Sequence, residues 1–542
     1  MPANSSPSLL LEDLAVTYDG RWILDGISLA ASAGNRVGLV GENGSGKSTL
    51  LRLAAGVEPP TRGAVHAPAD LGYVAQDGGL DPEHTIARVL HDALAPLHAA
   101  VRELEELATG LEQPGAADRY DEVLAWATRH DAWTATARAE RAAALLGLEQ
   151  LSHDRPVGTL SGGQRGRLAL AALLARRPDC VLLDEPTNHL DDTALTFLEE
   201  ELRTMSGVVV AASHDRTFLD GVCTSIVDLD RTHFGTDGEG GRSYTGNYSD
   251  YLAEKARSRA RWQEAFEAQQ EELNELRATA RTTNLDVAHD RPPRDGDKFI
   301  YAFKGSRVQA TVSRRRRNAE QRIAAIERAR ISKPPKTLRF GGTFSADGAG
   351  WVSARDAAVA GRFRIGRLDV CAGEHWLITG ANGSGKSSLL AAIAGELALG
   401  HGTLELSARR IGFLRQEISF AEPHLTPLQA YGDDESQLGL DALGLLPPRD
   451  ARRPIGQLSL GQQQRLALAM LIAGRPDLVL LDEPTNHLSL GLVEELEAAL
   501  LDAPATVLVA SHDRWLRSRW SGPMVRLGRE LVQERELEPP LT

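Results

Sequence analysis

The chain has 542 residues, of which 42% are hydrophobic and 25% are charged, and its formal net charge is −14 at pH 7. This length exceeds what one hydrophobic core normally holds, so we expect two or more folded domains rather than a disordered chain. The negative charge excludes a nucleic-acid binder that is basic throughout, but it leaves room for a local basic element. No stretch approaches the roughly 18–20 apolar residues that cross a bilayer, and residues 1–16 do not read as a secretory signal, so we expect a cytoplasmic protein.

An internal repeat determines the expected architecture. Four short runs each occur twice in the same order: a glycine-rich run, an LSGGQ-type run, LLDEPTNHL and SHDR. The first copies are Gly41–Thr49, Leu160–Gln164, Leu182–Leu190 and Ser213–Arg216, and the second copies are Gly380–Ser388, Leu458–Gln462, Leu480–Leu488 and Ser511–Arg514. We therefore predict two similar α/β domains in tandem, over residues 1–249 and 336–542.

The first copy is longer than the second in one place. From the LSGGQ-type run onward the copies are offset by about 298 residues, whereas the glycine-rich runs are offset by about 339. Roughly 42 additional residues therefore lie between Gln76 and Leu160. This stretch has helical periodicity and few turn residues, so we predict a projecting helical arm within about 81–155.

Residues 250–335, between the two copies, differ from them in composition. Apolar residues with heptad-like spacing flank a Pro/Gly-rich break, and they are Trp262, Phe266, Leu273, Leu276 and Ala280 before it, and Val312, Ala319, Ile323 and Ile326 after it. The simplest structure is a pair of antiparallel helices joined by a tip. A flexible charged linker is the alternative, and the spacing on both sides argues against it.

Each glycine-rich run follows a short apolar run and precedes a helical pattern, as in a phosphate-binding loop. Glycines let backbone N–H groups curl around phosphates, and the following helix presents its positive end. We expect Lys47 and Lys386 to reach the β- and γ-phosphates, and Ser48 and Ser387 to bind Mg²⁺. The residues predicted to form the two loops are Gly41, Glu42, Asn43, Gly44, Ser45, Gly46, Lys47, Ser48 and Thr49, and Gly380, Ala381, Asn382, Gly383, Ser384, Gly385, Lys386, Ser387 and Ser388.

Two apolar runs of strand length each end in Asp-Glu. An aspartate at the end of a buried strand can hold the Mg²⁺ coordination shell, and we assign this role to Asp184 and Asp482. The next carboxylate in the chain, Glu185 or Glu483, is placed to polarise the attacking water as a general base.

Four more polar residues follow apolar runs in the same order within each copy. His214 and His512 can contact the γ-phosphate and orient the attacking water. Gln76 and Gln416 fit the positioning of water and metal, and they are candidate ligands of the Mg²⁺ shell. A lone His or Gln would more often be structural, but their fixed order beside the phosphate loops reverses that expectation.

Together these motifs resemble the ATP-binding-cassette family, across nearly the whole chain outside residues 250–335. The resemblance implies two P-loop ATPase domains that use ATP and Mg²⁺, with each ATP sandwiched between the glycine-rich loop of one copy and the LSGGQ-type run of the other. On this basis the site of Lys47 is completed by Ser459, Gly461 and Gln462, and the site of Lys386 by Ser161, Gly162, Gly163 and Gln164. Because both halves lie in one chain, the sandwich can form within a monomer.

The second copy departs from the family pattern. Tyr18 lies where the family stacks an aromatic ring on adenine, whereas counting back equally in the second copy reaches Ala357, which cannot stack. Leu460 replaces the glycine at Gly162, and Ser489 stands where the first copy has Asp191. Both catalytic glutamates are present, so we expect both sites to hydrolyse ATP, at unequal rates.

Two cassettes in one chain, a paired-helix linker and the absence of a membrane span resemble the ABC-F group, whose members act on ribosomes. The run SYTGNYSDYLAEK at 243–255 matches the way that group enters its linker. The resemblance implies a 70S ribosome partner, with the arm directed toward the E site and the linker contacting 23S rRNA and P-site tRNA. The linker sequence is also similar to the resistance proteins of antibiotic-producing actinobacteria, which protect ribosomes from macrolides, lincosamides or related drugs.

The charge of the linker independently favours a nucleic-acid partner. Between Arg291 and Lys333 there are about 13 Lys and Arg residues, Arg314–Arg317 among them, against about four acids. Phe299, Tyr301 and Phe303 alternate near the tip, and these aromatic side chains either stack on RNA bases or clamp the two helices together.

Two other functions fit parts of the sequence. A housekeeping translation factor acting on stalled ribosomes would share the fold and the chemistry without a drug phenotype. The ATP-binding subunit of a drug exporter would need a separate transmembrane chain, and it would give the basic linker no role. We therefore expect no transmembrane partner.

Overall fold

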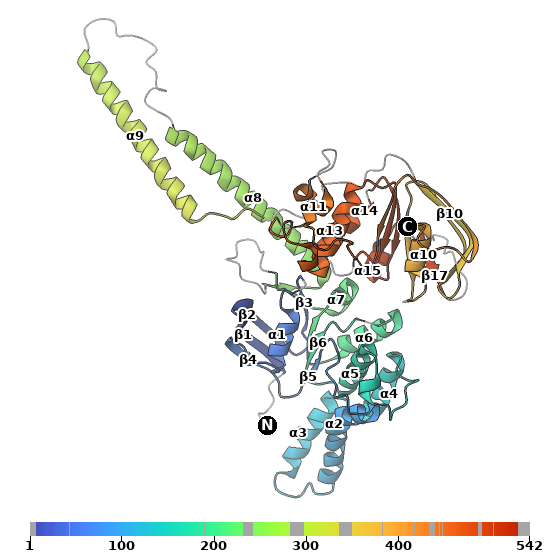
Figure 1. The fold of residues 1–542 in the computed structure, drawn as a ribbon. Helices are drawn as coiled ribbons and strands as arrows, with labels where there is room; N and C mark the ends of the chain where they lie inside the picture. Colours follow the sequence, from blue (N-terminus) through green and yellow to red (C-terminus); the bar gives the residue numbers. More distant parts are fainter. Residues whose placement is uncertain are drawn as a thin grey trace, which may run out of the picture. The chain divides into compact units, whose positions relative to one another are not determined.

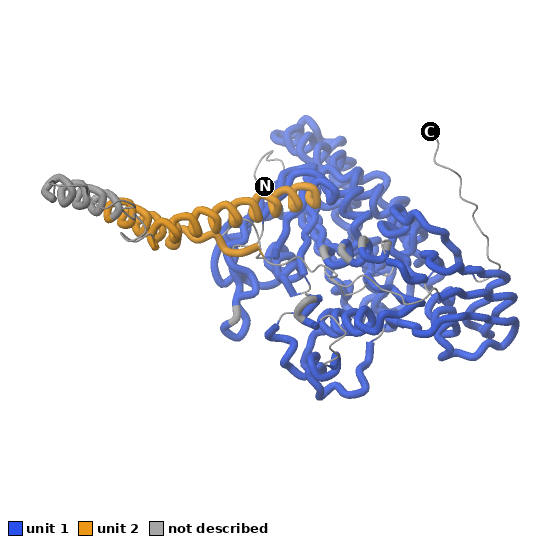
Figure 2. The backbone as a smooth tube through the Cα atoms, turned by 90° about the horizontal axis from the view of Figure 1, so that it is seen from above, with its two compact units in different colours: residues 1–230, 240–250, 336–542 blue, residues 231–239, 251–335 orange. Residues whose placement is uncertain are grey.

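The structure is a computed structural model that describes residues 7–42, 44–188, 190–230, 242–281, 298–334, 350–381, 383–416, 418–432, 439–443, 445–446, 448–485, 490–501 and 503–528. The chain divides into two compact units, which Figure 2 colours separately. One unit contains residues 1–230, 240–250 and 336–542, and the other contains residues 231–239 and 251–335.

The first half of the larger unit contains a mixed α/β domain (Figure 1). A six-stranded sheet has the order β5-β6-β7-β3-β8-β9, in which only the edge strand β9 is antiparallel to its neighbour. These strands are β3 (Arg36–Val40), β5 (Leu71–Val74), β6 (Cys180–Asp184), β7 (Val208–Ala212), β8 (Ser225–Asp228) and β9 (Arg242–Thr245), with helices α1 (Lys47–Ala54), α5 (Gly162–Arg176), α6 (Asp192–Thr204) and α7 (Arg216–Val222). A separate antiparallel sheet, β2-β1-β4, is formed by β1 (Ser8–Tyr18), β2 (Arg21–Ser32) and β4 (Arg62–His66).

The second half repeats this architecture. Its parallel sheet has the order β14-β15-β16-β12-β17, and its antiparallel sheet has the order β11-β10-β13. The strands are β10 (Trp351–Val359), β11 (Phe363–Val370), β12 (His375–Gly380), β13 (His401–Ser407), β14 (Ile411–Leu414), β15 (Leu478–Asp482), β16 (Thr506–Ala510) and β17 (Met524–Leu527), and the helices are α10 (Lys386–Ile393), α11 (Pro427–Tyr431), α12 (Leu440–Leu443), α13 (Leu460–Ala473), α14 (Leu490–Leu501) and α15 (Arg514–Arg519). The predicted tandem α/β fold is confirmed.

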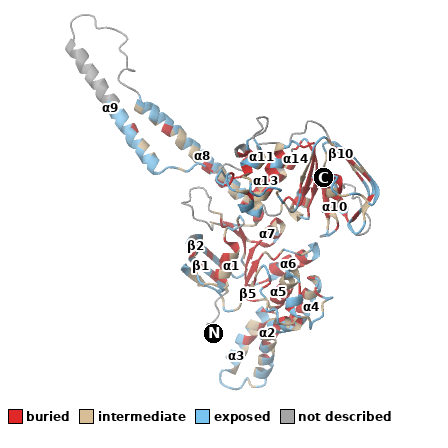
Figure 3. Cartoon of the chain, in the orientation of Figure 1, coloured by how far each residue is buried: buried red, intermediate tan, exposed pale blue. Residues whose placement is uncertain are grey.

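The central strands of both large sheets are buried along their whole length (Figure 3). Parallel strands covered on both faces need continuous apolar side chains, which explains runs such as LVLLD and TVLVA. Because these strands are parallel, their carboxyl ends meet at one edge of each sheet. The sequence motifs that follow β3, β6 and β7 are therefore brought together.

The extra residues of the first half form an arm of helices α2 (Ile86–Ala108), α3 (Ala116–Arg129) and α4 (Ala135–Leu145). Thr85 caps the first helix, since its hydroxyl oxygen accepts a hydrogen bond from the Arg88 amide. Leu97 and Ala127 are fully buried between the helices, and the same apolar cluster reaches Ala175 of α5. The arm therefore has its own core, continuous with the domain that carries it.

The smaller unit contains most of helix α8 (Tyr248–Arg281) and helix α9 (Lys298–Arg328). The indole of Trp262 donates a hydrogen bond of 2.9 Å to the Ser332 carbonyl, and farther along α8 Glu272 pairs with Arg322 at 2.9 Å. Trp262, near the start of α8, thus contacts the segment that follows α9, whereas the later Glu272 contacts α9 itself, so the two helices run antiparallel. The tip, residues 282–297, lies outside the described residues.

Cys180 and Cys223 are buried, but Cys371 is exposed, so the three cysteines do not share one environment. Across the described part of the chain, no helix combines the length and the apolar character needed to cross a bilayer.

Candidate nucleotide-binding sites

The first glycine-rich loop connects β3 to α1 and has a conformation that only glycine adopts easily. Gly41 has a φ of 150° and Gly46 a φ of 100°, and a Cβ on Gly46 would lie 2.5 Å from Leu24 Cδ2. The Nζ of Lys47 donates hydrogen bonds to the carbonyl oxygens of Gly41 at 2.8 Å and Glu42 at 3.3 Å. The lysine is thus folded over the loop in which phosphates would lie.

The second loop repeats this geometry between β12 and α10. Gly380 and Gly385 have φ values of 151° and 94°, and a Cβ on Gly385 would collide with the carbonyl oxygen of Arg362. Lys386 Nζ donates to the carbonyl oxygens of Gly380 at 3.0 Å and Ala381 at 3.4 Å. Both halves therefore present the same cradle of backbone amides at a helix N-terminus.

A buried side-chain oxygen in each loop lacks a partner among the described residues, namely the hydroxyl oxygen of Ser45 and that of Ser384 at the corresponding position. Oδ1 of Asp482, at the end of β15, also lacks one. A buried polar atom without a hydrogen bond is costly, and in a native protein it commonly marks a site for a ligand or an ion. These atoms, together with the glycine cradles, fit the phosphates of a nucleotide and a Mg²⁺ ion.

The proposed Mg²⁺ ligands lie beside the loops. Ser48 Oγ donates a 3.1 Å hydrogen bond to Oδ1 of Asp184, the last residue of β6. Burial raises the pKa of Asp184, although the Ser48 hydrogen bond and the charge of Lys47 oppose the rise. Burial likewise raises the pKa of Asp482. Both carboxylates would gain from a cation that compensates their burial.

Glu185, one residue past β6, is held in an unusual backbone conformation with a φ of 51°. Its carboxylate accepts a 3.3 Å hydrogen bond from the His214 amide, and its Oε1 lies 3.5 Å from His214 Nε2. Burial raises the pKa of Glu185 to about 7, against the opposing charge of Lys47. A carboxyl group with a pKa near neutrality is suited to general-base chemistry.

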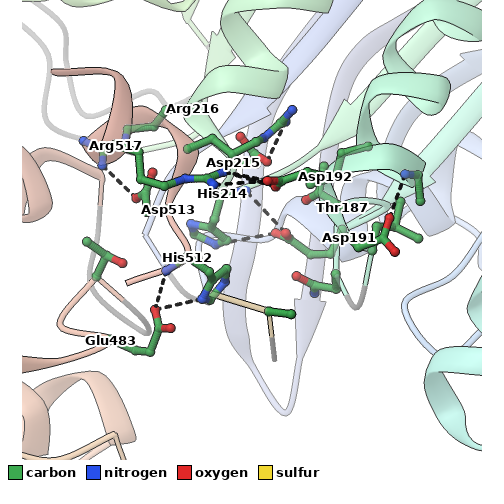
Figure 4. A pocket seen from close by; sticks show the side chains of 18 of the residues that line it. Thr187, Asp191, Asp192, His214, Asp215, Arg216, Glu483, His512, Asp513 and Arg517 are labelled. Carbon is green, nitrogen blue, oxygen red and sulfur yellow. Dashed lines mark hydrogen bonds and ion pairs between the residues drawn. The ribbon is translucent and has the colours of Figure 1, made fainter. Parts of the chain in front are cut away.

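In the second half the glutamate and the histidine lie closer together than Glu185 and His214 do. Glu483 has a φ of 48°, and its Oε2 lies 2.8 Å from His512 Nδ1, an interaction drawn in Figure 4. The hydrogen bond from His512 to Glu483 raises the pKa of His512. Glu483 Oε1 also lies 3.7 Å from Lys386 Nζ. The carboxylate is therefore paired at both oxygens.

Residues of both halves line one cavity of about 2520 Å³. From the first half it is lined by Tyr18, Lys47, Ser48, Gln76, Glu185 and His214, and from the second half by Lys386, Ser387, Gln416, Glu483 and His512. The structure therefore brings together most of the predicted catalytic and phosphate-binding residues of the two repeats.

The two LSGGQ-type runs are not among the residues that line this cavity. Ser161 and Ser459 instead cap α5 and α13, each accepting a hydrogen bond from the amide of a glutamine three residues later. Gly162 and Gly163 border a small pocket beside Gln76 and Glu185 of their own half.

The strand pairing changes the expected counterpart of Tyr18. Tyr18 pairs with Arg21 at the end of the β1–β2 hairpin, whereas Val359 pairs with Phe363 at the end of the β10–β11 hairpin. Counting along the sequence reached Ala357, which is a buried core residue, because β11 has 8 residues where β2 has 12, so the second hairpin lies nearer to its glycine-rich run. Tyr18 itself donates a 2.7 Å hydrogen bond to Glu58 and remains 40% exposed.

Sequence reasoning missed a set of ion pairs between the halves. Arg216 binds Glu497 and Asp513, with its Nη1 3.0 Å from Glu497 Oε2 and its Nη2 2.8 Å from Asp513 Oδ2. Arg514 Nη2 lies 2.6 Å from Glu199 Oε1 and 3.0 Å from Asp215 Oδ2. Repetition of the SHDR arginine and of a glutamate at the common offset was a signal that could have identified them.

Several predicted residues lie outside the described ones. They are Asn43, Asn382 and Ser489, and the side chains of Phe299, Tyr301 and Phe303.

Comparisons with known proteins show what the chain is similar to. A family profile described as ABC transporter matches residues 24–188 and 365–486, and a second profile with the same description matches residues 235–284. The tylosin resistance ATP-binding protein TlrC of Streptomyces fradiae is 38% identical, covering 98% of this chain and 99% of that protein. The energy-dependent translational throttle protein EttA of Escherichia coli K12 is 32% identical over 92% of this chain and 88% of that protein.

Among solved structures, the archaeal ribosome recycling factor aABCE1, bound to the ribosomal stalk protein aP1, covers 95% of this chain with a TM-score of 0.56. It is 18% identical, and 87% of that chain is covered, so the likeness concerns the fold alone. A structure described as RNase-L inhibitor gives a TM-score of 0.55 with the same identity and coverage.

Proposed function

Since the chain belongs to the ABC transporter family, and within it to the ABC-F group, we propose that it is a Mg²⁺-dependent ATPase that protects the ribosome from a large-subunit antibiotic. The observation that carries this proposal is the full-length similarity to a tylosin resistance protein, which includes the linker. The drug would be a macrolide, a lincosamide or a related compound.

The proposed reaction is hydrolysis of ATP to ADP and phosphate at both sites. Lys47 would exchange its carbonyl partners for phosphate oxygens, and Glu185 would accept a proton from the attacking water while His214 orients it. Lys386, Glu483 and His512 would have the same roles in the second half. A Mg²⁺ ion held by Ser48, Gln76 and Asp184, or by Ser387, Gln416 and Asp482, would neutralise the phosphate charge.

We propose that each nucleotide is gripped by both halves. The loop of Lys47 would be completed by Ser459, Gly461 and Gln462, and the loop of Lys386 by Ser161, Gly162, Gly163 and Gln164. Two observations support closure within one chain: the ion pairs of Arg216 and Arg514 already span the halves, and both phosphate loops face one cavity. ATP binding would favour a closed form and hydrolysis an open one.

The linker would be the part that acts on the ribosome. Arg314–Arg317 are exposed on α9, and Arg316 pairs with Glu320 at 3.2 Å, so most of this positive charge faces solvent. Such a face suits the phosphates of 23S rRNA and P-site tRNA. In the proposed cycle the ATP-bound protein enters the E site, its linker extends toward the peptidyl-transferase centre, and the drug departs.

A housekeeping translation factor is the second candidate function. The similarity to the translational throttle protein over most of both chains favours it. Both proposals share the ATPase and the ribosome, and they differ in whether the chain changes drug sensitivity.

The test is expression in a drug-sensitive bacterium, with inhibitory concentrations measured across large-subunit antibiotics. We expect a rise for at least one macrolide or lincosamide, which is lost when Lys47→Ala and Lys386→Ala are combined. No change for any drug, from a chain that still co-sediments with 70S ribosomes, would favour the translation factor instead.

A further inference from the structure

One ion pair joins the first phosphate loop to the second half. Arg465, on α13 one turn beyond the LSLGQ run, places Nη2 3.1 Å from Oε1 of Glu42. The arginine side chain is 15% exposed and the glutamate 54% exposed. The amide of Glu42 is itself held by Oδ1 of Asp230 at 2.8 Å, so the backbone that presents the carboxylate is fixed.

The other loop has a different residue at the corresponding position. Ala381 stands where the first loop has Glu42, so the second loop offers a methyl group in place of a carboxylate. Arg167, the counterpart of Arg465, donates within its own half, to the carbonyl oxygens of Gly163 at 3.3 Å and Leu146 at 3.1 Å. The two loops thus differ in charge at corresponding positions: the first loop offers a carboxylate to the helix that follows the LSGGQ-type run of the other half, and the second loop offers none.

We propose that Glu42 is a positioning residue that draws α13 onto the first loop, so that the site of Lys47 retains its nucleotide longer than the site of Lys386. The inference rests on the proposed gripping of each nucleotide by both halves. Because the pair spans the halves, its attraction is gained only when they approach, and it therefore stabilises the closed form of one site. Arg465 is mostly buried with its Nε unpartnered, so removal of Glu42 also leaves a poorly solvated cation.

A second ion pair between the halves provides a matched control. Arg517 of α15 lies 3.1 Å from both carboxylate oxygens of Asp192, and Asp192 is 64% exposed. This pair also joins the two halves, but neither residue belongs to a glycine-rich loop or to an LSGGQ-type run. Asp192→Asn should therefore weaken the interface in general without a preference for one nucleotide.

The experiment measures release of a fluorescent ATP analogue from the full chain. Hydrolysis is blocked by Glu185→Gln with Glu483→Gln, and Lys386→Ala or Lys47→Ala restricts loading to the first or the second loop. In the chain that carries Lys386→Ala, and so loads only the first loop, Glu42→Gln should accelerate release of the analogue about twofold to fivefold, the effect of a partly exposed ion pair. In the chain that carries Lys47→Ala, and so loads only the second loop, Glu42→Gln should leave the release rate of the analogue unchanged.

Charge reversal separates a direct attraction from a general structural effect. Glu42→Arg and Arg465→Glu should each accelerate release from the first loop, and combining them should restore slow release. The inference is overturned if Glu42→Gln has no effect, if it affects both loops equally, if Asp192→Asn shows the same preference for the first loop, or if the combined reversal fails to restore slow release.

Ser459→Arg distinguishes the role of Glu42 from the proposal that each nucleotide is gripped by both halves. If Ser459→Arg accelerates release from the first loop and Glu42→Gln does not, the sandwich stands and the role of Glu42 is wrong. If Ser459→Arg has no effect, the sandwich itself is wrong and the role of Glu42 falls with it.

Discussion

Arg216 and Arg514 occupy corresponding positions in the two halves, and each binds a glutamate and an aspartate of the opposite half. The partners correspond as well, because Glu199 and Glu497 are related by the same offset of about 298 residues. The interface between the halves is therefore built from one contact used twice. Figure 4 shows Arg216, Asp215 and Asp513 in the wall of the shared cavity.

Removal of one of these arginines should destabilise the protein strongly. The Arg216 side chain is 1% exposed, and its partners Glu497 and Asp513 are only 12% and 21% exposed, so Arg216→Ala would leave two largely desolvated carboxylates without their cation. We expect a loss of about 3–5 kcal/mol in the free energy of unfolding, measured by urea denaturation. Arg517→Ala, which removes an exposed ion pair, is the control and should cost about 0–1 kcal/mol. Equal losses in the free energy of unfolding for Arg216→Ala and Arg517→Ala would show that the burial of Arg216 does not determine the strength of its ion pairs.

The two glutamates proposed as general bases should contribute unequally to turnover. Burial raises the pKa of Glu185 to about 7, whereas Glu483 is paired at both oxygens with His512 and Lys386. We expect Glu185→Gln and Glu483→Gln, measured separately by phosphate release, to lower turnover by different factors. Together they should lower it about 100-fold or more. Identical losses in the single variants would refute the inequality.

The attachment of the arm should depend on pH through Asp70. His130 is buried, with Nδ1 2.8 Å from the Trp126 carbonyl and Nε2 3.1 Å from Asp70 Oδ2, while Arg176 also binds Asp70. Burial alone would raise the pKa of Asp70, but the His130 hydrogen bond and the Arg176 charge outweigh it and hold the pKa below 3.8. Because the folded-state pKa is depressed, this stabilisation is present above pH 3.8 and is lost as the pH falls through the folded-state value.

Asp70→Asn tests this dependence. At pH 7 the substitution should reduce the free energy of unfolding by about 1–3 kcal/mol, the range for a hydrogen bond to a charged group. The difference from the unsubstituted chain should shrink as the pH falls below 3.8. A difference that stays constant over this range would show that the charge of Asp70 is not what stabilises the attachment.

The exposed arginines of α9 should govern binding to the ribosome. Replacing Arg314, Arg315 and Arg317 with Gln should weaken co-sedimentation with 70S ribosomes and reduce its dependence on salt, because each cation displaces counterions from RNA. Arg257 and Arg261 on α8 both pair with Glu254, so their replacement is the control with the smaller expected effect. Unchanged binding after the α9 replacements would exclude this face as a contact.

Local motifs predicted the fold well because each repeat carries its own signals. The glycine-rich runs, the Asp-Glu pairs and the histidines indicated where strands end, since each follows an apolar run of strand length. Pairs distant in sequence were harder to predict. The contacts of Arg216 and of Arg465 depend on how two domains approach each other, and no local periodicity reports that. The error at Ala357 arose because β11 is shorter than β2, a difference that spacing counted along the chain does not reveal.

The most direct test of the shared-site mechanism is a structure of the Glu185→Gln, Glu483→Gln chain with ATP and Mg²⁺. We predict Ser459 and Gly461 against the γ-phosphate held by Lys47, and Ser161 and Gly163 against the one held by Lys386. A nucleotide enclosed by a single half, with both LSGGQ-type runs distant from any γ-phosphate, would contradict the mechanism.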